Sequence, residues 1–246
     1  MNDPSSSGLR RRGPAFLLLL IAFGFLGVLT LLLASLDALL PPGVEIPPAA
    51  LLIQPTIFLV ACALLGWWAA PKLGLDAPVI GALAERGDWL GALRGALPLG
   101  LAGGVLSAAA LVVYGLVTGS YFADQPAGLD LPMATRVGYG GVVEEILNRW
   151  GLMSLLALAA FKLGLARPGA LWAGNLAAAL LFALGHLPAL YALVDPPAWL
   201  LAAVMLGNTS VGLIFGWLFA RRGLEAAMIA HAGAHLFAVP VLTLIG

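Results

Sequence analysis

Long apolar runs separated by short polar turns cover most of this chain. The first run, from Pro14 to Leu40, follows three arginines. It is long enough to cross a hydrocarbon layer, which needs roughly 20 apolar residues, and longer than the roughly 7–15 residues of a secretory signal core. We therefore predict an uncleaved first membrane helix. Breaks at proline, glycine and charged residues divide the remaining sequence into predicted helices at about 49–70, 94–118, 137–165, 169–188, 199–220 and 224–246.

These runs predict an all-α fold, a polytopic transmembrane helix bundle of about seven spans. The most polar internal stretch, 71–93, contains enough apolar residues for a short interfacial helix, although a solvated loop explains it equally well. We divide the chain into a cytoplasmic tail at 1–13, N-terminal transmembrane helices and loops at 14–130, and a transmembrane core at 131–246 that holds the candidate catalytic residues.

Composition supports a membrane protein whose first partner is the lipid bilayer. Hydrophobic residues make up 61% of the 246 residues and charged residues 10%, against about 25% charged residues in soluble domains. The net charge is zero, which argues against a nucleic-acid partner. The single cysteine, Cys62, excludes an intrachain disulfide. Basic residues occur in alternate connections, so the positive-inside rule predicts a cytoplasmic N-terminus, and the short loops suggest a multi-pass protein of a prokaryotic plasma (inner) membrane.

Three charged residues, Glu144, Glu145 and Arg149, interrupt the apolar segment at 137–165. A charge at the bilayer centre costs about 2.5–3.5 kcal/mol on insertion scales, so such residues usually have partners. At α-helical spacing Glu145 and Arg149 share a face and can form an ion pair, whereas Glu144 lies about 100° away over the neutral Asn148. We predict that the pair is supporting and that Glu144 is free to act as a general base. The alternative is a buried polar cluster whose only role is to hold the helices together.

The three histidines of the chain, His186, His231 and His235, also lie in apolar, helix-like sequence. Three buried histidines beside an unpaired Glu144 are better explained by one shared site than by three separate packing roles. Their depths differ, because His231 lies about 10 Å from the cytoplasmic end of its helix while His186 falls near the outer end of a helix that begins at Gly169. Either that helix begins later, or it is strongly tilted.

Together these residues form three motifs, E-E-x-x-x-R at 144–149, F-x-x-x-H at 182–186 and H-x-x-x-H at 231–235. In this order and in separate apolar helices, they resemble the CAAX prenyl endopeptidase family, also called the CPBP or Abi family of intramembrane proteases. The resemblance extends over about 138–237. That family usually has Asn or Asp where this chain has His235.

The resemblance implies an endopeptidase that hydrolyses a peptide bond of a membrane-associated or peptide substrate. Glu144 would activate the water with help from His186, while His231 and His235 would face the scissile carbonyl oxygen. For bacterial members it also suggests processing or immunity roles toward bacteriocin-like peptides rather than prenylated substrates.

Two alternatives stay open at this point. Glu144 and the three histidines are also a plausible zinc first shell, since His231 and His235 have the i, i+4 spacing of zinc-binding helices, although the adjacent Glu of H-E-x-x-H is missing. The protein would then be a metalloprotease; otherwise we expect no cofactor. The same cluster could instead serve a non-hydrolytic transporter or proton-relay protein, although no inverted repeat is visible.

Overall fold

The computed structural model describes residues 12–35, 46–123 and 131–245, and over these ranges the chain is helical without a strand. The elements in chain order are α1 (Pro14–Leu29), the 3₁₀ turn η2 (Thr30–Leu33), α2 (Pro48–Ala69), the 3₁₀ turn η4 (Ala70–Leu73), α3 (Pro78–Ala84), α4 (Trp89–Ala123), α5 (Met133–Thr135), the π-helical η5 (Arg136–Glu144) and η6 (Ile146–Met153), α6 (Ser154–Lys162), α7 (Arg167–Gly185), α8 (Leu187–Leu193), α9 (Ala198–Arg222) and α10 (Leu224–Ile245).

The all-α polytopic bundle is confirmed. Within the described ranges, 6 helices are long and apolar enough to cross a membrane: Pro14–Leu33, Pro48–Leu73, Trp89–Ala123, Arg167–Leu193, Ala198–Arg222 and Leu224–Ile245. The remaining predicted span is the helical segment at 133–162, which carries Glu144, Glu145 and Arg149 and is not among the 6. The predicted tail up to residue 11 and the predicted break at 41–43 lie outside the described residues.

The polar stretch at 71–93 contains the short helix α3 with Ile80 buried, so the predicted short helix is present in place of a solvated loop. Arg12 holds this region: its Nε donates to Asp76 at 3.1 Å and its Nη1 to Glu85 at 2.8 Å. The hydrogen bond to Asp76 raises the pKa of Arg12, which stabilises its charge. From α10, Glu225 accepts a hydrogen bond from the Ile80 backbone N–H at 2.9 Å.

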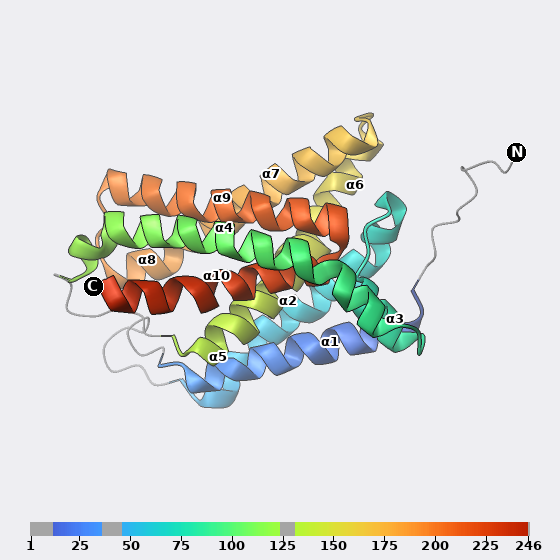
Figure 1. Cartoon of the computed structure of the whole chain (residues 1–246), viewed down its shortest axis with the longest axis horizontal. Coiled ribbons are helices and arrows are strands. Elements are labelled where there is room, and N and C mark those ends of the chain that lie inside the picture. Colours follow the sequence, from blue (N-terminus) through green and yellow to red (C-terminus); the bar gives the residue numbers. More distant parts are fainter. Residues whose placement is uncertain (1–11, 36–45, 124–130, 246) are drawn as a thin grey trace, which may run out of the picture.

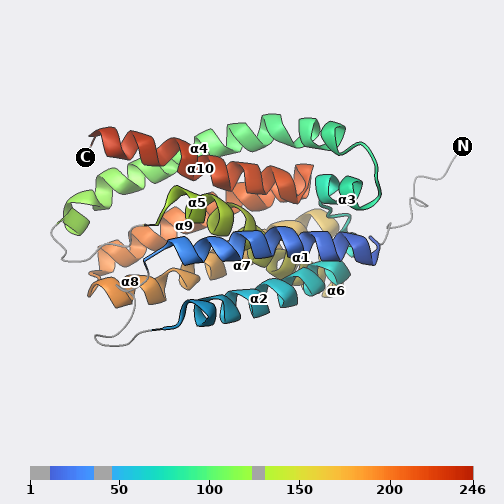
Figure 2. The same cartoon turned by 90° about the horizontal axis from the view of Figure 1, so that it is seen from below.

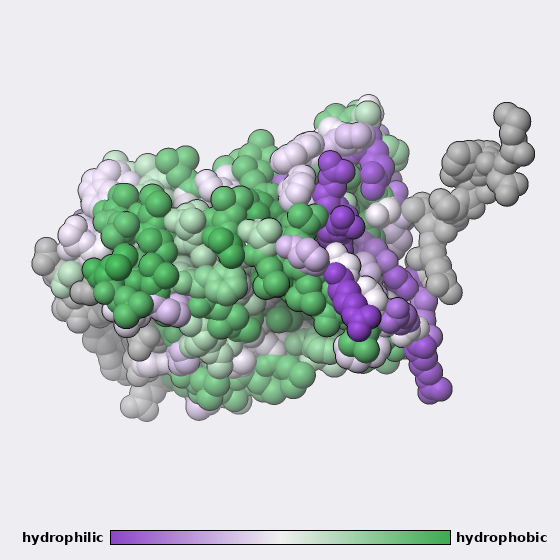
Figure 3. All heavy atoms as spheres, in the orientation of Figure 1, coloured by the Kyte–Doolittle hydropathy of each residue, from purple (hydrophilic) through white to green (hydrophobic). Residues whose placement is uncertain are grey.

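The polar and apolar surfaces are separated along the length of the bundle. Figure 3 shows hydrophilic residues gathered at the end where α3 lies, while most of the rest of that face is hydrophobic. Helices α4, α9 and α10 run side by side in Figure 1, and Figure 2 shows α1 and α2 along another face. Glycines bring α4 and α10 together, since a Cβ on Gly104 would lie 3.2 Å from the Cα of Gly233.

The segment at 136–153 is π-helical except at Glu145, and it lies inside the bundle. π-Helices are rare and are frequently found at functional sites. Its η6 half is anchored to α2 by the buried Trp150, whose indole N–H donates to the carbonyl of Ala63 at 3.1 Å. Gly66 leaves the room for this indole, because a Cβ there would overlap it.

The course of α7 bears on the different depths predicted for the histidines. It begins at Arg167, so it does not begin later than predicted. Figure 1 instead shows α7 strongly inclined to α4 and α9. His186 ends this helix, and α8 continues the chain at once. The tilt lets Phe182, one turn before His186, reach the π-helical segment, where its ring lies 5.2 Å from the Arg149 guanidinium carbon.

Candidate active site

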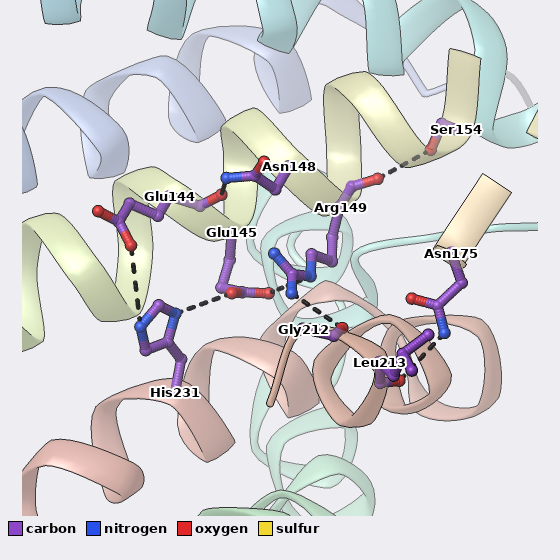
Figure 4. A network of polar contacts seen from close by, with 9 residues as sticks. All are labelled: Glu144, Glu145, Asn148, Arg149, Ser154, Asn175, Gly212, Leu213 and His231. Atoms are coloured by element: carbon purple, nitrogen blue, oxygen red, sulfur yellow. Dashed lines mark hydrogen bonds and ion pairs between the residues drawn. The ribbon is translucent and has the colours of Figure 1, made fainter. Parts of the chain in front are cut away.

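Glu145, Arg149 and His231 form a buried line of polar contacts (Figure 4). Glu145 Oε2 lies 3.3 Å from Arg149 Nε, and the two side chains are 0% and 1% exposed, so the predicted ion pair is present. The other carboxylate oxygen, Oε1, lies 2.8 Å from His231 Nδ1. Because a carboxylate oxygen only accepts hydrogen bonds, Nδ1 of His231 carries the proton in this contact.

Glu144 faces the second nitrogen of the same imidazole. Its Oε2 lies 3.8 Å from His231 Nε2, and its side chain is 23% exposed where that of Glu145 is fully buried. The neighbouring Asn148 donates to the backbone oxygen of Glu144 at 3.0 Å, so it does not occupy the carboxylate. Two adjacent carboxylates therefore flank one histidine, and the accessible one is Glu144.

Arg149 is fixed by contacts on several sides. Its Nη2 donates to the Gly212 carbonyl on α9 at 2.9 Å. The guanidinium carbon lies 5.2 Å from the Phe182 ring and 5.5 Å from the Phe215 ring, distances at which a cation and an aromatic face attract. Its position is thus set by α7 and α9 as well as by Glu145.

Aromatic rings join the histidines. The His231 ring stacks on Phe215 at 4.7 Å and lies 5.3 Å from the ring of His235. Phe182 meets His186 edge-on at 4.6 Å and His231 at 6.1 Å. His186 Nδ1 is 2.8 Å from the Phe182 carbonyl, which accepts, so Nε2 of His186 is left as an acceptor. The structure thus brings Glu144, Glu145, Arg149 and the three predicted histidines into one cluster.

Two residues of this cluster were not predicted as part of a site. Phe215 on α9 covers the His231 ring, and its sequence context gives no sign of this contact. Gly140 is buried in η5, and a Cβ built on it would lie 3.4 Å from His235 Nε2 and 3.6 Å from His231 Nε2. The three glycines just before Glu144, at 138, 140 and 141, signal a close approach, but α-helical spacing could not show which of them faces the histidines.

The zinc shell formed by Glu144 and the three histidines stays a prediction. Among the described residues, no group of three or more His, Cys, Asp and Glu side chains is placed to hold a metal ion. His231 Nδ1 is hydrogen-bonded to Glu145, while Nε2 lies 3.8 Å from the Glu144 carboxylate. These residues can accept and donate protons at one point.

Comparison with known families places this cluster in a recognised domain. Residues 127–237 match the family model described as type II CAAX prenyl endopeptidase Rce1-like. Neither the curated proteins nor the solved structures compared gave a match. The matched range contains Glu144, Glu145, Arg149 and all three histidines. The chain is thus a multi-pass membrane protein whose residues 127–237 are similar to the type II CAAX prenyl endopeptidase Rce1-like family.

Proposed function

We propose that the protein is an intramembrane endopeptidase that hydrolyses a peptide bond of a membrane-associated substrate, with Glu144 activating the water. The observation that carries this proposal is the placement of Glu144 and Glu145 on the two nitrogens of His231. One carboxylate is buried and paired; the other is partly exposed and free for proton transfer. The family match supports a peptidase at the level of the family.

Glu144 is suited to be the general base. A carboxylate that is 23% exposed can be reached by water, whereas Glu145 is fully buried between Arg149 and His231. Glu144 would take a proton from the attacking water as the new C–O bond forms, and would return it to the amine that leaves as the C–N bond breaks. His186, whose Nε2 is left as an acceptor, would orient the same water.

His231 is suited to stabilise the oxyanion. Two carboxylates and one guanidinium leave the cluster with a charge of −1, and a protonated His231 would balance it. In that form Nδ1–H donates to Glu145 and Nε2–H is available to the developing oxyanion, as a charge-assisted and therefore stronger hydrogen bond. His235, whose ring lies 5.3 Å from that of His231, would provide a second donor.

The test is cleavage of a peptide library by the purified protein in nanodiscs, with the new termini identified by mass spectrometry. Glu144→Gln keeps the shape of the side chain but removes the base, so the rate should fall by about 10²–10⁴. Asp195→Asn is the matched control, since Asp195 is an exposed carboxylate in the turn before α9. Near-normal cleavage by Glu144→Gln would refute the proposal.

Two further arms of the experiment address the substrate and the alternative class. Each cleaved peptide is offered with and without a C-terminal prenylated cysteine, which shows whether the lipid named in the family description is required by this chain. Proton flux in sealed vesicles is measured for the wild type and Glu144→Gln. Flux that depends on Glu144, in the absence of cleavage, would establish the proton-relay alternative.

A further inference from the structure

We infer that the missing side chain of Gly140 leaves room for the oxyanion of the tetrahedral intermediate beside the Nε2 atoms of His231 and His235. The inference rests on the proposed function and adds a substrate-positioning residue to it. Gly140 is buried in η5, one turn before Glu144, so the same segment would supply both the base and this space.

The two imidazoles converge on this glycine. A Cβ on Gly140 would lie 3.4 Å from His235 Nε2 and 3.6 Å from His231 Nε2. An oxyanion needs donors at about 2.7–3.1 Å. An oxygen that contacts both Nε2 atoms from the side of Gly140 therefore lies close to the position of the Cβ that alanine would have there. Non-bonded carbon and oxygen atoms need roughly 3.5 Å between them. A side chain at 140 and an oxyanion in hydrogen-bond contact with both nitrogens therefore exclude each other.

Packing does not explain this glycine, although it explains its neighbours. A Cβ on Gly138 would lie 2.7 Å from Thr30 Cγ2, and one on Gly141 would lie 2.9 Å from Ala232 Cβ, so both are needed for helix contacts. At Gly140 the nearest atoms belong to the two histidines and lie at ordinary contact distance. Gly140 is not among the glycines with positive φ either, so alanine fits its backbone.

The test is Gly140→Ala, compared with Gly119→Ala in α4, where a Cβ would meet nothing within 4 Å. With the peptide that the wild type cleaves, Gly140→Ala should lower kcat about 100-fold or more, as for loss of oxyanion donors, with thermal unfolding unchanged. A phosphinate analogue of the peptide, which mimics the tetrahedral intermediate, should bind more weakly by a similar factor. The intact peptide should bind Glu144→Gln and the Glu144→Gln/Gly140→Ala double variant about equally. Gly119→Ala should match the wild type in all of these measurements.

Several results would overturn the inference. Cleavage by Gly140→Ala within about threefold of the wild type, while Glu144→Gln is inactive, would reject the role of Gly140 and leave the proposed function standing. A large drop in thermal stability would show that Gly140 is a packing residue. Bound zinc in the wild type that Gly140→Ala loses together with activity would show that the space holds a metal. Absence of cleavage by the wild type would reject the proposed function and this inference with it.

Discussion

Replacing Arg149 by alanine should destabilise the protein far more than removing the charge of Glu144. Arg149 is 1% exposed and Glu145 is 0% exposed, so the substitution leaves a carboxylate in the bundle interior without its cation. It also removes the donor to the Gly212 carbonyl and the cation between Phe182 and Phe215. Glu145 would keep one contact, the 2.8 Å hydrogen bond from His231 Nδ1.

The magnitude follows from these contacts. Breaking a buried ion pair by removing one partner costs about 3–5 kcal/mol. The Gly212 carbonyl lies in the interior of α9 and keeps its helical hydrogen bond, so losing the Arg149 donor adds little to this cost. We therefore expect a loss of about 3–5 kcal/mol for Arg149→Ala. Glu144→Gln removes one contact of 3.8 Å from a side chain that is 23% exposed, and we expect it to cost less than about 1 kcal/mol.

Thermal unfolding of the purified variants in one detergent measures this difference. At about 2–4 °C per kcal/mol for a chain of this size, Arg149→Ala should lower Tm by roughly 6–20 °C and Glu144→Gln by less than about 4 °C. Arg94→Ala is the control, since Arg94 is exposed on α4. Equal losses for Arg149→Ala and Glu144→Gln would show that Arg149 does not neutralise a buried charge, and the reasoning about the cluster would fail.

The remaining predictions concern the chemistry and the polar end. His235→Asn keeps an N–H donor and should retain most of the peptidase activity, whereas His235→Ala should lose about 10²–10³ in kcat. Metal analysis that finds near-stoichiometric zinc in the wild type, and loss of this zinc together with activity in His235→Asn, would show a metalloprotease instead. Glu145→Gln should lower kcat about 10–100-fold with little change in KM, because the amide still accepts from His231 but no longer offsets its charge; an unchanged kcat would contradict this role. Arg12→Ala should expose α3 to limited proteolysis while activity in the peptide assay is kept, because Arg12 joins Asp76 and Glu85 far from the histidines in sequence.

The local pairing within the membrane could be predicted from sequence because hydrocarbon offers no other partner. An ionised residue in an apolar segment must find its counter-charge nearby, and the i, i+4 spacing of Glu145 and Arg149 was enough to identify it. The helices could be predicted for a similar reason, since a spanning segment must satisfy its own backbone. Neither constraint depends on the path of the rest of the chain.

The geometry around that pair could not be predicted, because it depends on π-helical turns and on a tilted helix. The i, i+4 spacing placed Asn148 beside Glu144, but it could not show that Asn148 donates to the backbone oxygen and leaves the carboxylate to face His231. The position of Gly140 next to the histidines could not be predicted for the same reason. Phe215 meets His231 through the packing of α9 on α10, for which a single sequence contains no periodic signal.

His231 is the point where the stability of the cluster and its chemistry meet. Through Glu145 and Arg149 it connects α10 to the π-helical segment, and through Arg149 to the Gly212 carbonyl of α9, so three elements are held by one line of polar contacts. Each charge in that line would be costly in hydrocarbon by itself, at about 2.5–3.5 kcal/mol, and each is offset by its neighbour. The line uses one nitrogen of His231 and leaves the other facing Glu144. The contacts that make buried charge tolerable thus also fix which imidazole nitrogen faces the proposed substrate.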